Sequence, residues 1–157
     1  MSACNITDEF VRETGRRAQW ENRCITLAEA VLYSGHPVAA GGQIVGFEPV
    51  TALGLPVPGG GALWHFHAAP LIQGLVHDAW WPDLVLTPVD FAAAAWPETE
   101  VRIHIGDADE IGQALHQARL RIAPRWVEFL RQRGKDVDAD ALAARIASGF
   151  AGGVVAP

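Results

Sequence analysis

The sequence predicts an α+β fold in which one helix packs on a small antiparallel sheet and further helices follow. Apolar residues recur at helical spacing from Ile25 to Leu32. Strand-like segments flank a tight turn between residues 63 and 78. Helical patterns then return after residue 106. Together these observations favour a helix on an antiparallel sheet, with helices in the C-terminal third.

The chain has 157 residues, which fits one domain with a core of its own. Half of its residues are hydrophobic and 19% are charged, so an ordered protein is expected. The expected parts are an N-terminal helix and arm over 1–19, a central core over 20–105, C-terminal helices over 106–150 and a loose tail over 151–157.

Two helices are expected before the sheet. The first is a short polar helix over 8–19. The second follows Asn22, a good N-cap residue, and its pattern ends at Gly35 and Pro37. Cys24 therefore lies in the first turn of a helix whose apolar face is expected to pack in the core.

Four segments are expected to form strands: 43–47, 63–72, 75–78 and 100–105. The segment 51–62 is expected to be a loop because it holds two prolines and three consecutive glycines. Gln73 and Gly74 predict a tight turn between the second and third strands.

Four helical segments are expected in the second half of the chain: a short one from Thr87 to Trp96, then 107–118, 124–132 and 138–148. Pro124 is expected in the first turn of its helix, where the missing N–H group is not needed.

Composition excludes several classes of protein. The net charge of −6, with basic residues scattered along the chain, argues against a nucleic-acid partner. Apolar runs stay shorter than the roughly 18 residues of a membrane span, so no membrane partner is expected. Two cysteines are too few for a disulfide scaffold. The N-terminus lacks an apolar signal region, which predicts a cytoplasmic protein or one exported without a cleaved signal peptide.

Strand parity places the histidines of the segment 63–72. Side chains two residues apart on a strand point to the same face, so His65 and His67 are expected to share one face. The opposite face is then expected to carry Trp64, Phe66 and Ala68.

The hairpin turn then predicts a histidine–carboxylate pair. With a two-residue loop at Gln73-Gly74, Ala69 lies opposite Asp78, which emerges on the face of His67 and within reach of it. His77 emerges on the other face. A carboxylate beside His67 fixes the tautomer of the ring and stabilises its imidazolium form.

Cys24 supplies the third member of a catalytic arrangement. Its place at a helix N-terminus is expected to lower the pKa of its thiol and to favour the thiolate. Cys24 as nucleophile, His67 as base and Asp78 as orienter follow the logic of a catalytic triad. Backbone N–H groups at the same helix start are candidate donors to an oxyanion.

The order of these residues and the short sequences around them resemble those of the papain-like amidases of the bacterial protein-glutaminase type. The matching features are Cys24 in RCITLAEAV, Trp64 and His67 in WHFHAAP, Asp78 in LVHDAWWP and Trp96 after TPVDFAAAA. The resemblance implies a papain-like fold and assigns the triad to Cys24, His67 and Asp78.

The resemblance covers residues 20–97 and implies deamidation of glutamine side chains in a protein or peptide substrate, without a cofactor. Related enzymes with the same order of residues transfer acyl groups to amines or cleave peptide bonds, and both reactions stay open. So does a non-catalytic module that binds a partner, in which Cys24 is an inert core residue. The sequence leaves open whether the chain is a housekeeping enzyme or an effector.

Five residues are candidates for the substrate cleft. Trp80 and Trp81 directly follow Asp78, and His65 and Trp64 precede the candidate base. Gln19 is an oxyanion-donor candidate by analogy with papain-like enzymes, five residues before the nucleophile.

The His65–His67 pair also permits a metal-binding alternative. Zinc or iron ligation would use His65, His67 and Asp78, completed by Cys24 or His104.

Overall fold

The computed structural model describes residues 4–15 and 23–148, and the chain has an α+β fold over this range. The helices are α1 (Ile6–Thr14), α2 (Cys24–Leu32), α3 (Pro88–Ala95), α4 (Ala108–Gln132) and α5 (Ala139–Ala147). The strands are β1 (Gln43–Pro49), β2 (Leu55–Pro56), β3 (Leu63–Trp64), β4 (His67–Ile72), β5 (Leu75–His77), β6 (Val85–Leu86) and β7 (Val101–Gly106). Within the same residues, no helix combines the length and apolar character needed to cross a bilayer.

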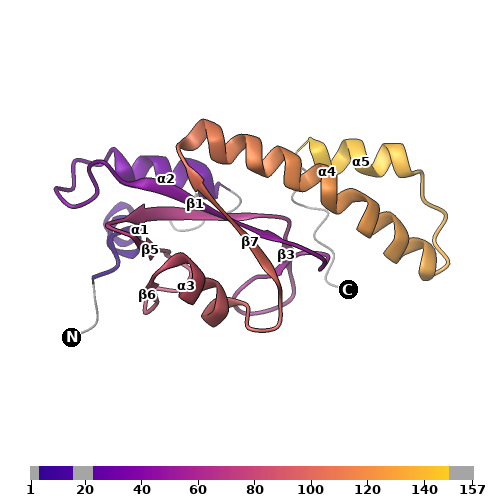
Figure 1. The fold of residues 1–157 in the computed structure, drawn as a ribbon, viewed down its shortest axis with the longest axis horizontal. Helices are drawn as coiled ribbons and strands as arrows, with labels where there is room; N and C mark the ends of the chain where they lie inside the picture. Colours follow the sequence, from indigo (N-terminus) through magenta and orange to yellow (C-terminus); the bar gives the residue numbers. More distant parts are fainter. Residues whose placement is uncertain (1–3, 16–22, 149–157) are drawn as a thin grey trace.

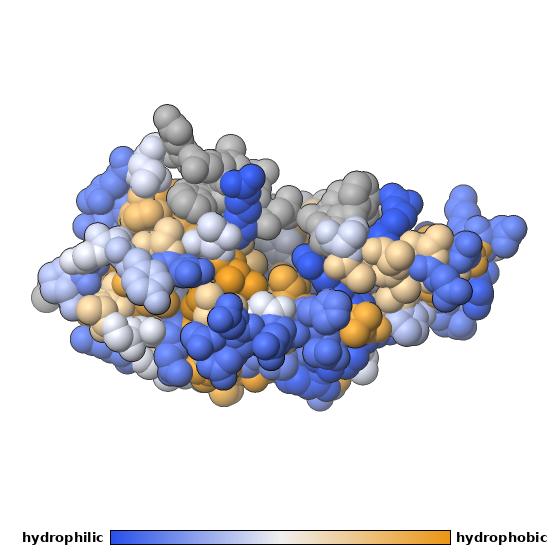
Figure 2. Space-filling view, turned by 90° about the horizontal axis from the view of Figure 1, so that it is seen from above, coloured by the Kyte–Doolittle hydropathy of each residue, from blue (hydrophilic) through white to orange (hydrophobic). Residues whose placement is uncertain are grey.

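The main sheet has five antiparallel strands in the order β6-β5-β4-β1-β7, and β2 and β3 pair separately. Helices α2 and α4 lie on one side of this sheet and α3 on the other, with α5 beside α4 (Figure 1). Seen from the side of α2 and α4, hydrophobic residues reach the surface in the middle and hydrophilic residues surround them (Figure 2). The predicted antiparallel sheet with a helix packed on it is confirmed.

Each face of the sheet has its own apolar core. The α3 side is filled by Val45, Phe47, Ala69, Leu71, Val76, Phe91 and Trp96. The α2 and α4 side is filled by Ala28, Ile44, Phe66, Ala68, Ile111 and Ala118, with Cys24 packed at its edge. Successive residues of β1 and β4 alternate between the two cores, as strands covered on both faces must.

The predicted hairpin is confirmed in register. Leu71 pairs with Val76, and Ile72 pairs with Leu75. Gln73 and Gly74 both take positive φ angles, of 52° and 77°. Two positive φ angles define the turn type whose twist matches that of the flanking strands. The short turn therefore sets the register that aligns the residues after β5 with those before Pro70.

The predicted single strand over 63–72 is wrong, because it breaks at His65 and Phe66. Its first part, β3, pairs with β2 inside the segment expected to be a loop, with Leu55 opposite Trp64. Phe66 instead turns its ring onto Gly46 of β1, where no side chain is present. Strand parity therefore does not extend across this break.

The helices expected over 107–118 and 124–132 are one continuous helix, with Pro124 in its interior. A proline there removes one backbone hydrogen bond. Residues on both sides of it are buried: Ile122, Ala123, Trp126 and Val127. Packing of this face outweighs the local preference, as it commonly does for long helices.

The first helix begins at Ile6, earlier than expected, because the side chain of Asn5 caps it by accepting a hydrogen bond from the Asp8 amide at 2.9 Å. It ends before Gly15, which has a left-handed φ of 63°. The rest of the expected helix and the cap expected at Asn22 lie outside the described residues. The helices expected near Thr87 and over 138–148 are confirmed as α3 and α5.

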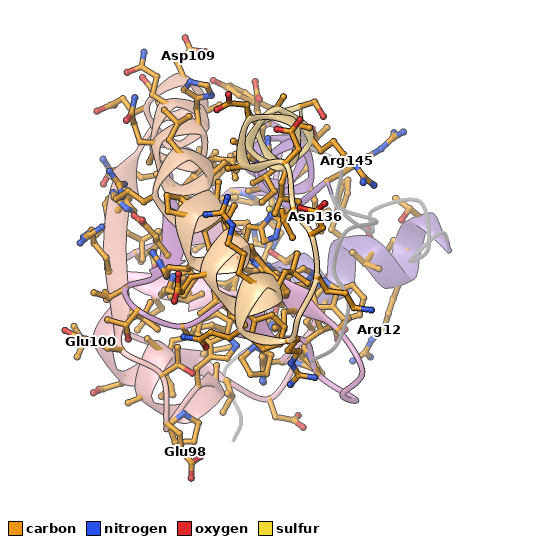
Figure 3. All side chains as sticks on the ribbon, turned by 90° about the vertical axis from the view of Figure 1, so that its right-hand side faces the viewer. Arg12, Glu98, Glu100, Asp109, Asp136 and Arg145 are labelled. Carbon is orange, nitrogen blue, oxygen red and sulfur yellow. The ribbon has the colours of Figure 1, made fainter. Side chains whose placement is uncertain are left out.

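A buried carboxylate ties α4 to the sheet. Glu48 of β1 is 1% exposed, whereas the charged side chains of Glu98, Glu100, Asp109 and Arg145 point outward (Figure 3). Arg121 of α4 donates to both Glu48 oxygens, from Nε at 2.7 Å and from a terminal nitrogen at 2.9 Å. His104 and Arg102 of β7 contact the same carboxylate at 3.0 and 3.2 Å.

This network fixes the charge of Glu48. Burial alone would raise the pKa of the carboxyl group, but hydrogen bonds from Arg121 and His104 lower it from 4.5 to about 2. The carboxylate therefore stays ionised across the physiological range and clamps three elements together.

Substitution of Gly46 by Ala is expected to lower the free energy of unfolding by about 1–3 kcal/mol, because a methyl group there overlaps the Phe66 ring. Gly112→Ala is the matched control. Nothing lies within 4 Å of the point that its added methyl group would occupy, so this helical site should gain about 0.5–1 kcal/mol. Urea unfolding measures both changes, and equal effects would contradict the close approach of Phe66.

Glu48→Gln is expected to cost about 2 kcal/mol at neutral pH, since charged hydrogen bonds are lost. The folded pKa lies below the ordinary value, so the contribution is complete above pH 4.5 and is lost as the pH falls towards 2. Unfolding curves of wild type and variant should therefore converge in acid. Glu98→Gln, at an exposed position, should change stability little at any pH.

Candidate active site

His67 and Asp78 form a buried pair beside the hairpin. Oδ2 of Asp78 contacts Nε2 of His67, and the two side chains are 2% and 3% exposed. Oδ1 of Asp78 accepts a hydrogen bond from the Trp80 amide at 2.7 Å. Both carboxylate oxygens are thus engaged, which fixes the orientation of the group. The predicted contact between His67 and Asp78 is confirmed, while its catalytic role stays a prediction.

The pairing determines which nitrogen of His67 is available. Asp78 occupies Nε2, so the neutral ring is expected to carry its proton on that nitrogen. Nδ1 then keeps its lone pair. The pair therefore leaves Nδ1 as the ring nitrogen that Asp78 does not contact.

Aromatic rings enclose His67. The ring of Trp64 stacks on it at a centroid distance of 4.3 Å with an interplanar angle of 9°. Trp81 and Trp96 meet it edge-on at 5.9 and 6.1 Å. The expectation that Trp64 lies on the opposite face from His67 is wrong, because the strand breaks between them. The stacked ring limits access of water to the His67–Asp78 pair.

Cys24 is the first residue of α2, as expected, and lines one small cavity together with His67 and Asp78. The volume of this cavity is about 10 Å³, which is room for about one water molecule. The thiol interacts with the backbone of Ala68, the residue after His67. The helix start therefore reaches the first residues of β4.

Cys24 and His67 approach this cavity from opposite sides of the sheet. Alternation along β4 places the His67 side chain with Ala69 on the α3 side. Helix α2 packs on the other side, against Ala68. Both residues nevertheless line the cavity, and His67 is the first residue of β4.

The expectation of a lowered pKa for Cys24 is wrong. Burial of the sulfur raises the pKa of the thiol from 9.0 to about 11, and the negative charge of Asp78 raises it further, against the backbone of Ala68, which lowers it. The cost of desolvating a thiolate outweighs the effect of the helix terminus. The resting thiol is consequently protonated at neutral pH, so an attack by Cys24 requires a base.

Helix α1 braces the end of β5 that carries Asp78, a role that sequence analysis missed. The Asn5 side chain donates to the backbone carbonyl of Asp78 at 2.8 Å. The Ile6 amide donates to Nδ1 of His77 at 3.1 Å. The short polar residue before a helical pattern was a signal for the cap at Asn5. The hydrogen bond from the Asn5 side chain to Asp78 joins residues 73 positions apart, so no local sequence pattern predicts it.

Of the other cleft candidates, Trp80 and Trp81 lie at the site and His65 does not. Trp80 lines the cavity, and Trp81 contacts His67. His65 lies against Trp126 of α4 at 6.4 Å, so the prediction that it shares a face with His67 is wrong. Gln19 lies outside the described residues.

The metal alternative lacks its ligand set. Over residues 4–15 and 23–148, no three side chains of His, Cys, Asp or Glu are grouped to hold a metal ion. The break in the strand separates His65 from His67, and His104 is bound to Glu48.

Comparison with protein-family models, with curated proteins and with solved structures finds no match for this chain.

The contact between Ile6 and His77 predicts a pH-dependent loss of stability. Burial lowers the pKa of His77 below 6.5, and the charge of His36 lowers it further. The neutral ring accepts the Ile6 hydrogen bond, so its contribution is complete above pH 6.5 and is lost as the pH falls through the lower folded value. Urea unfolding at pH 7.5 and at pH 5 should show this loss, at most about 1.4 kcal/mol per pH unit.

His77→Gln should reduce this pH dependence, and His116→Gln, at an exposed position of α4, should keep it. An unchanged slope in His77→Gln would remove His77 as the cause.

Proposed function

We propose that this chain is a papain-type cysteine amidohydrolase that deamidates glutamine side chains in a protein or peptide. One observation carries the proposal: Cys24 lines the same small cavity as a His67 ring whose Nε2 is held by Asp78. A nucleophile, an available ring nitrogen and an orienting carboxylate are the parts of a triad.

The first step forms a thioester. The Cys24 sulfur attacks the carboxamide carbon, and its proton moves to Nδ1 of His67. Asp78 stabilises the imidazolium. The tetrahedral intermediate then collapses, the carbon–nitrogen bond breaks, and His67 returns the proton to the departing ammonia. Because the resting thiol is protonated, His67 acts as a general base during attack and not as the partner of a preformed thiolate.

The second step restores the enzyme. Water attacks the thioester carbon, His67 removes a proton from the water, and Cys24 leaves with a proton. The product carries a carboxylate in place of the carboxamide. A cavity with room for about one water molecule is consistent with a small leaving group and a small attacking group.

The start of α2 supplies donors for the oxyanion. The first backbone N–H groups of a helix have no partner within the helix. Arg23, at the N-cap position, makes no capping hydrogen bond with its side chain. The backbone groups of Cys24 and Ile25 interact with the Cys24 sulfur, next to the attacked carbon, and they suit the negative oxygen of the intermediate.

Ammonia release from short acetylated glutamine peptides and from an unfolded glutamine-containing protein tests the proposal. Cys24→Ala and His67→Ala should abolish release, because each removes a group that takes part in bond formation or proton transfer. Asp78→Asn should lower kcat by about 10²–10⁴ because it disturbs the tautomer of His67. His116→Ala, at an exposed position, should keep full activity.

Folding of each variant is checked by circular dichroism and thermal unfolding. Loss of the fold in Cys24→Ala would support a structural cysteine in a binding module. Cleaved peptide bonds without ammonia would replace deamidation by proteolysis. Ammonia released together with a cross-linked product, and without a new carboxylate, would replace it by transfer to an amine.

A further inference from the structure

We propose that Arg119 is the counter-charge of Cys24: its guanidinium stabilises the negative charge that forms on the sulfur. The catalytic importance of this charge rests on the proposed function, while its effect on the sulfur is measurable without catalysis.

Packing brings the relevant stretch of α4 to Cys24. Ala118 is 1% exposed and belongs to the core that also contains Ala28 of α2. Cys24 and Leu115 pack against the same core. Arg119 directly follows Ala118, so it lies where α4 passes the start of α2.

The guanidinium of Arg119 is incompletely satisfied. Its Nε is buried and has no hydrogen-bond partner among the described residues. The neighbouring arginines of α4 are bound: Arg121 pairs with Glu48, and Arg125 donates to the Pro49 and Ala52 carbonyls. A buried donor without a partner costs free energy, and such groups concentrate at functional sites.

Electrostatics links Arg119 to both sides of the site. Burial lowers the pKa of Arg119, and Cys24 acts in the opposite direction. The charge of Arg119 also lowers the pKa of His65, which burial already depresses. Its positive charge is therefore felt at the sulfur and at the segment that precedes His67.

The charged groups around Cys24 have opposing effects on the negative charge of a thiolate at its sulfur. His67 of β4, His77 of β5 and Asp78 directly after β5 line the cavity, and the Asp78 charge disfavours a thiolate. From α1 the lining residue is the uncharged Thr7. Arg119 approaches from α4 with the sign that favours an anion. During attack the thiol proton goes to Nδ1 of His67, and Arg119 keeps its own protons.

Alkylation of Cys24 tests this in a Cys4→Ser background, where one thiol remains. The rate with iodoacetamide is measured from pH 7 to pH 9.5 for wild type, Arg119→Gln, Arg119→Lys and the control Arg131→Gln. Well below the thiol pKa, the rate follows the small thiolate fraction. Arg119→Gln should be about tenfold slower at each pH, which corresponds to a rise of one pKa unit. Arg119→Lys should recover most of the rate, and Arg131→Gln should match wild type.

Iodoacetate, a carboxylate of nearly the same size, provides a second measure. Its rate relative to that of iodoacetamide should fall severalfold in Arg119→Gln, because a positive charge beside the sulfur attracts the anionic reagent. The melting temperature of Arg119→Gln should equal or exceed that of wild type, since the substitution removes an unpartnered donor. A purely structural arginine would show a lower melting temperature with unchanged alkylation.

Equal alkylation rates and equal reagent ratios in wild type and Arg119→Gln would overturn the inference, whatever the ammonia assay shows. Slower alkylation in Arg119→Gln without ammonia release by wild type would uphold Arg119 as the counter-charge and refute deamidation. Ammonia release by wild type with unchanged alkylation in Arg119→Gln would uphold deamidation and refute the role of Arg119.

Discussion

The contact between the Asp78 carboxylate and Nε2 of His67 is the interaction on which the rest of the site depends. A carboxylate that is 2% exposed is stable only when its oxygens are engaged, and here His67 and the Trp80 amide engage both. Much of the surrounding structure serves to hold this pair. The hairpin turn sets the register, Asn5 of α1 grips the Asp78 backbone, and Trp64 stacks on the imidazole. The catalytic proposal follows because Asp78 contacts Nε2 and leaves Nδ1 available, and because His67 and Cys24 line the same cavity.

Burial has opposite consequences for the His67–Asp78 pair and for the Cys24 thiol. It strengthens the interaction between His67 and Asp78, because a low local dielectric strengthens a satisfied charge-assisted bond. It also raises the pKa of the Cys24 thiol to about 11, so that the nucleophile rests in its protonated form. A site of this kind generates its thiolate only as the proton moves to His67. Such a site needs positive charge near the sulfur during that step, and in our proposal Arg119 on α4 supplies it.

The sequence predicted the contact between His67 and Asp78 better than it predicted the elements around it. A period of two along β4, together with a two-residue turn, placed Asp78 beside His67 correctly, because local geometry fixes both. The period of two failed at His65, because the strand breaks there and the Phe66 ring covers Gly46. Gly46 belongs to β1, so this contact is not visible in the local sequence around His65. Pro124 was expected to begin a helix, yet burial of Trp126 and its neighbours keeps α4 continuous through it. The network of Glu48, Arg121 and His104 had no local signature, because its members come from β1, α4 and β7.

The sequence by itself determined the class of the fold, the place of Cys24 at the start of a helix and the pairing of His67 with Asp78. These depend on interactions within about a dozen residues, which spacing and turn chemistry express directly. The tertiary structure alone decided that Cys24 reaches the same cavity, that burial overrides the helix terminus in setting its pKa, and that α1 contributes Asn5. Desolvation and long-range charge depend on which distant segments cover a group, and one-dimensional spacing does not contain that information.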